Sequence, residues 1–270
     1  MTGDNEWAVI LGVSTGTGAA IALEVAGRCA LNVYGLHRGY KPEAAERVAA
    51  DVRGLGREMT TRVGNAGSAE AARMGVAALK EQVGPRRVRL LVHSIANASL
   101  GHLAVGPAPV DAARIEKTFS SMAHSFVYWA RELHQQDMLA PSARLLALGN
   151  PVTDSLADDL GLIAAAKSAL EIYVRVLAME LGPLGHRVNL LKFGLVDTRA
   201  AQVAFAPEAW DQVMALAASV TPAGRLCTVE EVARFVAVLV GPAAEWFNGA
   251  TIDFTGGMAQ GLLNLVHHPR

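Results

Sequence analysis

Three glycines stand at a spacing that suits the binding of a phosphate group. They lie in the segment Gly12-Val13-Ser14-Thr15-Gly16-Thr17-Gly18, which follows a short apolar run and opens a helical pattern. Gly12 can adopt a turn conformation that suits a residue without a Cβ atom, Gly16 lets backbone approach a pyrophosphate, and Gly18 lets the helix close on the strand. The helix amino terminus would then face the phosphates. A glycine-rich turn without a ligand is the alternative, but the strand, loop and helix order predicts dinucleotide binding. The expected contacts include Ser14, Thr15 and Thr17.

Basic residues follow the second expected strand. A protein that prefers NAD usually presents Asp or Glu there to the ribose 2′-hydroxyl, and this sequence has neither at that place. Arg38, with Lys41 nearby, could pair with a 2′-phosphate instead, although both would otherwise be solvated surface cations. We therefore expect NADPH as the cofactor, with NADH less favoured. Asn65, after the third expected strand, is placed to reach the adenine amino group.

Short apolar runs alternate with longer helical patterns along the chain, which is the sequence sign of a parallel sheet. The expected strands are Trp7 to Leu11, Leu31 to Leu36, Met59 to Val63, Val88 to Ile95, Arg144 to Leu148, Arg187 to Lys192 and Ala250 to Asp253. The expected helices are Ala19 to Ala26, Pro42 to Gly54, Ser68 to Val83, Asp111 to Met138, Ala164 to Leu181 and a broken stretch from Ala201 to Val240, which restarts at a capping box on Thr228. This order predicts an α/β fold, a doubly wound parallel sheet of the Rossmann type with about seven strands and helices on both faces. We expect one domain over residues 1–270, with a substrate-side helical insertion at about 200–222.

The composition argues against several classes of partner. The 24 basic and 25 acidic residues give a net charge of −1, so the chain lacks the excess of positive charge that attracts nucleic acid or an acidic membrane surface. Neither a signal peptide nor an apolar run of about eighteen residues is visible. The two cysteines, Cys29 and Cys227, show no metal-ligand or redox spacing, so no metal site is expected. We expect a cytoplasmic protein with a small-molecule substrate.

The glycine spacing and three later blocks resemble the short-chain dehydrogenase/reductase superfamily over nearly the whole chain. Leu91-Val92-His93-Ser94-Ile95-Ala96 is similar to a segment of the enoyl-acyl carrier protein reductases, a subgroup of that superfamily. Two further blocks are similar to the same subgroup. They are the segment from Ala166-Lys167-Ser168 to Asn189 and the segment Thr221-Pro222-Ala223-Gly224-Arg225. The family's terminal Asp-Gly-Gly appears here as Thr255-Gly256-Gly257.

The resemblance implies roles for several further residues. Lys167 matches the lysine that binds the nicotinamide ribose and lowers the pKa of a proton-donating tyrosine. The segment from Gly194 to Thr198 matches the loop that contacts the carboxamide and phosphates. The cofactor contacts implied in these blocks are Ser94, Ile95, Ala96, Lys167, Gly194, Val196 and Thr198. The family also implies a homotetramer that assembles through packed helices.

The sequence departs from the family at the catalytic centre. The tyrosine is absent, because the two positions at which relatives carry it hold Ile163 and Leu160, neither of which can donate a proton. The usual serine position falls at Asn150, and the helix asparagine position falls near Ser121. Reduction of a ketone would therefore lack a general acid worth about 10²–10⁴ in rate.

Conjugate addition of hydride to an α,β-unsaturated carbonyl tolerates this loss better. Its product is a delocalised enolate, which hydrogen-bond donors stabilise and water can protonate later. We expect Lys167 and Asn150 to be the donors, and the pattern Leu148-Gly149-Asn150 resembles tyrosine-less reductases of antibiotic pathways. His124, on the helix beneath the site, is a further candidate because it could supply a proton near neutral pH, although a histidine in such a helix is more often a packed or hydrogen-bonded structural residue.

The sequence therefore predicts an NADPH-dependent reductase of an activated C=C bond, acting on a thioester or unsaturated carbonyl in a specialised or secondary-metabolic pathway. Three alternatives stay open: a cofactor-binding protein without redox turnover, a non-redox isomerase or dehydratase that reuses the pocket, and a carbonyl reductase with a non-standard proton donor. The acidic residues Asp154, Asp158 and Asp159 are expected to form a solvated turn rather than a site for a cationic group. The segments around 98–109 and 200–221 would shape the substrate pocket.

Overall fold

The computed structural model describes residues 5–154, 156 and 158–261, and there seven parallel strands form one sheet. The strands follow the spatial order β3-β2-β1-β4-β5-β6-β7. Their bounds are Trp7–Leu11 (β1), Asn32–His37 (β2), Met59–Val63 (β3), Val88–His93 (β4), Leu139–Gly149 (β5), Arg187–Phe193 (β6) and Thr251–Phe254 (β7). The strand order reverses between β1 and β4, and ligands of such sheets bind at the carboxyl ends of the strands near this point. The predicted Rossmann-type fold is confirmed.

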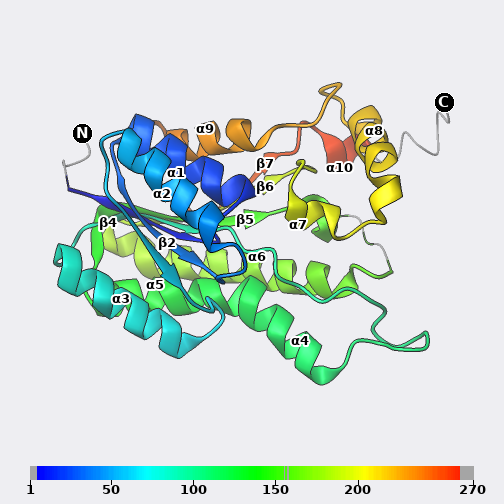
Figure 1. Ribbon diagram of the computed structural model, residues 1–270, viewed down its shortest axis with the longest axis horizontal. Helices are drawn as coiled ribbons and strands as arrows, with labels where there is room; N and C mark the ends of the chain where they lie inside the picture. The colour runs from blue at the N-terminus through cyan, green and yellow to red at the C-terminus, as the bar shows by residue number, and fades with distance from the viewer. Residues whose placement is uncertain (1–4, 155, 157, 262–270) are drawn as a thin grey trace.

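Helices cover both faces of the sheet (Figure 1). One face carries α1 (Gly16–Cys29), α2 (Pro42–Gly54) and α9 (Val229–Val240), and the other carries α3 (Ala69–Val83), α4 (Ala112–Phe119), α5 (Ser125–Gln135) and α6 (Gly161–Leu181). Alternate residues of β1 enter the two cores: Trp7, Val9 and Leu11 face α3, α5 and α6, whereas Ala8 and Ile10 face α1, α2 and α9. Because both faces are buried, the strand reads as a continuous apolar run.

The sequence predicts one continuous helix from Asp111 to Met138, and this prediction is wrong because the helix is interrupted. A π-helical turn, Ser120–His124, separates α4 from α5, which ends at Gln135. The carbonyl of Ser121 lies within hydrogen-bond distance of the Ser125 hydroxyl (2.6 Å) and of His93 Nε2 (3.3 Å). These side-chain contacts compete with the regular helical ladder, which accounts for the wider turn. Such turns occur often at functional sites.

The carboxyl ends of the strands are surrounded by the chain's irregular segments. Short helices α7 (Arg199–Gln202), α8 (Trp210–Val220) and α10 (Met258–Gly261) lie toward this end (Figure 1), and the first two fall in the segment where a substrate-side insertion is predicted. The predicted capping box begins α9, where Thr228 and Glu231 bond each other's backbone amides. No helix in the described part of the chain is long and apolar enough to cross a membrane.

Candidate active site

The glycine loop is held tightly against the strands on either side of β1. Gly12 has a φ of +93°, and its amide donates a hydrogen bond to the carbonyl of Leu36 over 2.9 Å. A Cβ atom on Gly12 would overlap the carbonyl oxygen of Ser94, and one on Gly18 would overlap that of Gly12. The chain can therefore pass between β2 and β4 only if these residues lack side chains.

The loop presents the amino terminus of α1. Thr15 is the N-cap residue in an extended conformation, and its side chain accepts no hydrogen bond from the first turn, which contains no acidic residue. The first amide groups of a helix lack intrahelical partners and favour a negative charge. Because no side chain caps this helix, its first amide groups can donate hydrogen bonds to a ligand. This geometry fits the pyrophosphate of a dinucleotide.

Two side chains predicted to contact the adenosine end follow neighbouring strands. Arg38 is exposed after β2, and its guanidinium lies 5.2 Å from the centre of the Tyr40 ring. Asn65 is exposed after β3, where its Oδ1 atom accepts a hydrogen bond from the Gly67 amide over 3.2 Å. Both therefore lie at the carboxyl edge of the sheet. Arg38 forms no ion pair with another described residue, so it can accept a phosphate as partner.

Loops after β4 and β6 approach the glycine loop from the other side. Ser94 follows β4, and its amide donates to the carbonyl of Leu11 over 2.9 Å. Thr198 caps α7 and lies against Gly16. A Cβ atom on Gly16 would be 3.1 Å from the methyl carbon of Thr198. Val196 is buried in the same loop. The structure thus gathers the predicted cofactor-contact segments after β1, β4 and β6, although their contact with a cofactor stays a prediction.

Lys167 is buried at the start of α6. Its side chain is directed at the end of β5, where Nζ donates a hydrogen bond to the carbonyl of Leu148 over 2.7 Å. Burial lowers the pKa of Lys167 from the usual value of 10.5 to about 8. An ammonium with this pKa remains largely protonated at neutral pH, yet it releases its proton more readily than an exposed lysine.

Asn150 lies two residues beyond the carbonyl that Lys167 contacts. Its Oδ1 atom is buried and has no hydrogen-bond partner among the described residues. A buried polar atom without a partner is costly in a folded protein, and such atoms are frequent where a ligand binds. Leu160 and Ile163, at the two tyrosine positions, lie at the N-cap and in the first turn of α6. The structure therefore places the Lys167 ammonium at the end of the strand that leads into Asn150, and Leu160 and Ile163 at the start of the same helix.

His93 is a residue whose importance the sequence analysis missed. It lies at the end of β4 and is fully buried, with Nε2 placed 2.7 Å from the Ser125 hydroxyl. The Ser125 hydroxyl donates to the carbonyl of Ser121, so its oxygen accepts from His93. Burial and the nearby charge of Lys167 lower the pKa of His93 to about 3. His93 is therefore a neutral support between β4 and the π-helical turn. Its position in an apolar strand could have indicated a buried, hydrogen-bonded histidine.

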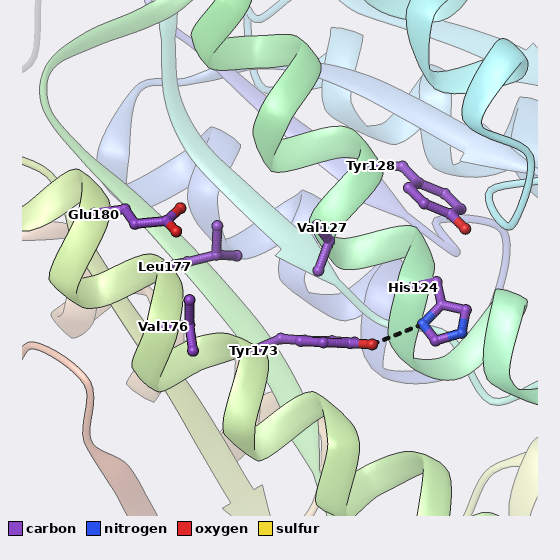
Figure 2. Close-up of a pocket in the computed structure, with 7 residues that line it drawn as sticks. All are labelled: His124, Val127, Tyr128, Tyr173, Val176, Leu177 and Glu180. Carbon is purple, nitrogen blue, oxygen red and sulfur yellow. Dashed lines mark hydrogen bonds between the residues drawn. The ribbon is translucent and has the colours of Figure 1, made fainter.

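His124 makes its contacts with aromatic side chains of α4, α5 and α6. Its Nδ1 atom lies 3.1 Å from the hydroxyl of Tyr173, and its ring contacts those of Phe119, Tyr128 and Tyr173. Figure 2 shows His124, Tyr128 and Tyr173 close together between α5 and α6. They line a groove of about 410 Å³ together with Val127, Val176, Leu177 and Glu180. The contacts of His124 thus belong to this groove.

The acidic residues Asp154, Asp158 and Asp159 are exposed and lie in turns, as predicted, and Asp154 also forms an ion pair. Asp154 pairs with the ammonium of Lys192, with 2.9 Å between Oδ1 and Nζ. Asp158 and Asp159 are exposed, and the carbonyl of Asp159 accepts from the amide of Gly101. The ion pair of Asp154 was not predicted, because Lys192 lies 38 positions away in the sequence.

Comparison with known proteins places this site in a family. Residues 12–259 match the family described as enoyl-(acyl carrier protein) reductase. The chain belongs to this family of short-chain dehydrogenases/reductases.

Individual relatives cover different shares of the chain. The 1-cyclohexenylcarbonyl-CoA reductase of Streptomyces collinus is 26% identical over 257 residues, which are 93% of this chain and 86% of that one. The dehydrogenase OXI1 of Cochliobolus heterostrophus is 41% identical over 99 residues, and the match spans only 36% of this chain and 43% of that one. A short-chain dehydrogenase from Burkholderia cenocepacia in complex with NADP superposes with a TM-score of 0.81 at 25% identity, covering 94% of this chain and 98% of that one.

Proposed function

We propose that this protein is an NADPH-dependent reductase that adds hydride to a C=C bond conjugated to a carbonyl, in an enone or an enoyl thioester. The observation that carries the proposal is the pairing of Lys167 with the end of β5 beside Asn150, in a site where Leu160 and Ile163 stand at the tyrosine positions. The cofactor would supply the hydride. The residues of the chain need then only hold the substrate carbonyl and stabilise the charge that reaches it.

The two reduction chemistries differ in what they demand of the protein. An alkoxide needs a proton as it forms, whereas an enolate spreads its charge and can be protonated later by water. The Lys167 ammonium and the Asn150 amide are hydrogen-bond donors of the kind that stabilises an enolate oxygen. Stabilisation of an enolate by these two donors requires no tyrosine hydroxyl in the first turn of α6.

The relatives are consistent with this chemistry. The Streptomyces collinus relative is named for reduction of 1-cyclohexenylcarbonyl-CoA, in which the C=C bond is conjugated to a thioester carbonyl. The Burkholderia cenocepacia structure contains NADP. We extend both properties to this chain as proposals, with Arg38 as the partner of the 2′-phosphate and a role in a specialised pathway.

We also propose that the protein is cytoplasmic and assembles as a homotetramer. The groove between α5 and α6 is open and mainly apolar, and α6 exposes Ile172, Val176 and Met179 nearby. Apolar side chains gathered on exposed helices are typical of an interface. His124 and Tyr173 would then lie in or near that interface.

The test is a turnover assay with purified protein and NADPH. Loss of NADPH absorbance with 2-cyclohexen-1-one or crotonyl-CoA, and not with the saturated ketone, is the expected result. Asn150→Ala should lower kcat by about tenfold or more, as removal of one oxyanion donor does in other enzymes. If the protein oxidises NADPH with none of the unsaturated probes, or if Asn150→Ala retains the full rate, the proposal is wrong in substrate class or in donor.

A cofactor-binding protein without redox turnover is the second candidate. The apolar residues Leu160 and Ile163 favour it, because an emptied catalytic centre with intact cofactor loops is what such a protein would show. It predicts NADPH binding without oxidation of NADPH by any substrate. The same assay, run beside a fluorescence titration of NADPH, separates the two functions. His124→Gln, which keeps a hydrogen-bonding side chain, then tests whether His124 supplies a proton to any observed reaction.

A further inference from the structure

A lysine near the candidate site is surrounded by acceptors from two other elements. Lys192 lies at the end of β6, and its side chain is only 9% exposed. Its Nζ atom contacts Asp154 Oδ1 at 2.9 Å, Thr153 Oγ1 at 3.0 Å and Glu171 Oε1 at 3.3 Å. The Thr153 hydroxyl also donates to Glu171 Oε1 over 3.0 Å. We call these four residues the Lys192 cluster.

The Lys192 cluster joins the two elements that carry the proposed donors. Lys192 is the register partner of Gly149 on β5, the residue directly before Asn150. Thr153 ends the 3₁₀ turn Pro151–Thr153 that follows Asn150, and Asp154 comes next. Glu171 lies four residues after Lys167 on α6, so the two share one face of that helix. One ammonium therefore ties the Asn150 segment to the helix of Lys167.

Asn150 depends on its backbone for orientation. Its Oδ1 atom has no partner among the described residues, so no protein donor contacts that end of its amide. The direction of the amide then follows from where β5 ends and how residues 151–154 turn. The Lys192 ammonium donates hydrogen bonds to the side chains of two consecutive residues of that turn, Thr153 and Asp154.

The charges of the cluster support a lasting contact. Burial favours the neutral form of Lys192, but hydrogen bonding to Asp154 and the charges of Glu171 and Asp154 outweigh burial and raise its pKa. Asp253 on β7 is the register partner of Lys192; burial acts to raise the pKa of Asp253, but hydrogen bonds with Thr255, and to a smaller extent the charge of Lys192, lower it below its usual value. At neutral pH the ammonium is thus charged and has acidic neighbours from three elements.

We propose that Lys192 is a positioning residue for the reduction: it holds the segment 150–154 so that the Asn150 amide and the Lys167 ammonium face the same substrate oxygen. This inference rests on the proposed function, because it assigns Asn150 and Lys167 the donor roles given there. Lys192 itself acts through Thr153, Asp154 and Glu171. A displacement of about 1 Å in such a pair is enough to cost as much as 10²-fold in rate.

The experiment compares Lys192→Met with Lys192→Arg in the full-length protein. Met keeps the length of the side chain without its charge, Arg keeps the charge, and Lys80→Met makes the same change at an exposed position on α3. The readouts are kcat and KM for 2-cyclohexen-1-one, the Kd of NADPH by fluorescence, and hydrogen exchange of residues 150–154. We expect Lys192→Met to lower kcat by roughly tenfold and to speed exchange in this segment, with the Kd of NADPH changed by less than about twofold. Lys192→Arg should restore most of the rate.

Other results would overturn the proposal. Unchanged kcat in Lys192→Met would do so, as would a loss of rate that Lys192→Arg fails to restore or that matches a loss of NADPH affinity. If Lys192→Met does not fold, Asp154→Asn weakens the same contact from the partly exposed side and should lower kcat in the same direction. If the wild-type protein binds NADPH but reduces no probe, the proposed function fails. Hydrogen exchange then still decides whether Lys192 holds the Asn150 segment.

Discussion

The ammonium of Lys167 donates a hydrogen bond to the carbonyl of Leu148, with 2.7 Å between Nζ and the oxygen. This contact joins the first turns of α6 to the last residues of β5. It places the buried cation two residues from Asn150, whose Oδ1 atom has no partner among the described residues. A cation and an amide are therefore available at one strand end.

Replacement of Lys167 by Met should separate catalysis from cofactor binding. The variant loses the cation that would stabilise a developing enolate, so we expect kcat to fall by about 10²-fold or more. The Kd of NADPH, measured by fluorescence, should rise by a smaller factor. Lys117→Met, the same change on the exposed surface of α4, is the matched control. A variant that weakens NADPH binding and leaves kcat intact would show that Lys167 holds the cofactor and does not stabilise the enolate.

The pH profile should report the burial of Lys167. Its pKa is lowered to about 8, so the ammonium is present below this pH and is lost as the pH rises through it. We therefore expect kcat/KM to be level on the acid side of about pH 8 and to fall about tenfold per pH unit above it. Residual activity of Lys167→Met should lack this break. A profile that stays level to pH 10 would show that Lys167 acts without its charge or not at all.

The features that were predictable from the sequence are those encoded by neighbours along the chain. The glycine loop and the alternating elements depend on spacings of a few residues, so β1 and α2 were placed with the bounds that the structure shows. The role of Lys167 was inferred from a continuous block of sequence in the same way, and it stays a prediction.

Contacts between distant residues could not be predicted. The ion pair of Lys192 with Asp154 spans 38 positions, so no partner was predicted for this exposed carboxylate. The bond between His93 and Ser125 spans 32 positions, and the resulting π-helical turn leaves the apolar periodicity of the helix nearly unchanged. One signal was available for Lys192, because a charged residue in the apolar strand Leu190-Leu191-Lys192-Phe193 requires a partner.

Replacement of Arg38 by Ala should change the preference between the two nicotinamide cofactors. The guanidinium is exposed beside Tyr40 and free to pair with a 2′-phosphate. A hydrogen bond to a charged group contributes about 1.5–3 kcal/mol, so the Kd of NADPH should rise by roughly 10- to 100-fold while that of NADH stays nearly constant. Arg47→Ala removes the same charge from the exposed face of α2 and should alter neither constant. Equal losses for both cofactors would remove the basis for assigning NADPH.

The burial of His93 should make the protein sensitive to acid. Its pKa is about 3 in the folded protein and near 6.5 when unfolded, so the unfolded state binds one more proton between these values. The contribution of His93 to stability is complete above pH 6.5 and falls by about 1.4 kcal/mol per pH unit as the pH decreases toward 3. His93→Gln should therefore show a shallower loss of unfolding free energy in urea over this range. His102→Gln, at an exposed position, should retain the wild-type slope; equal slopes in all three proteins would contradict the assignment.

The glycine loop should tolerate no side chain at its first position. Gly12→Ala would force a Cβ atom into the carbonyl oxygen of Ser94 while keeping a φ of +93° that disfavours alanine. Strain and overpacking together should lower the unfolding free energy by about 2 kcal/mol or more, and the displaced loop should lose most of its affinity for NADPH. Gly54→Ala is the matched control, because its Cβ atom meets no atom within 4 Å at the end of α2 and should raise stability by up to about 1 kcal/mol. Urea unfolding and NADPH titration of both variants give the two quantities. Wild-type affinity in Gly12→Ala would mean that the loop can move away from β4 without consequence, and the proposed pyrophosphate site would then lie elsewhere.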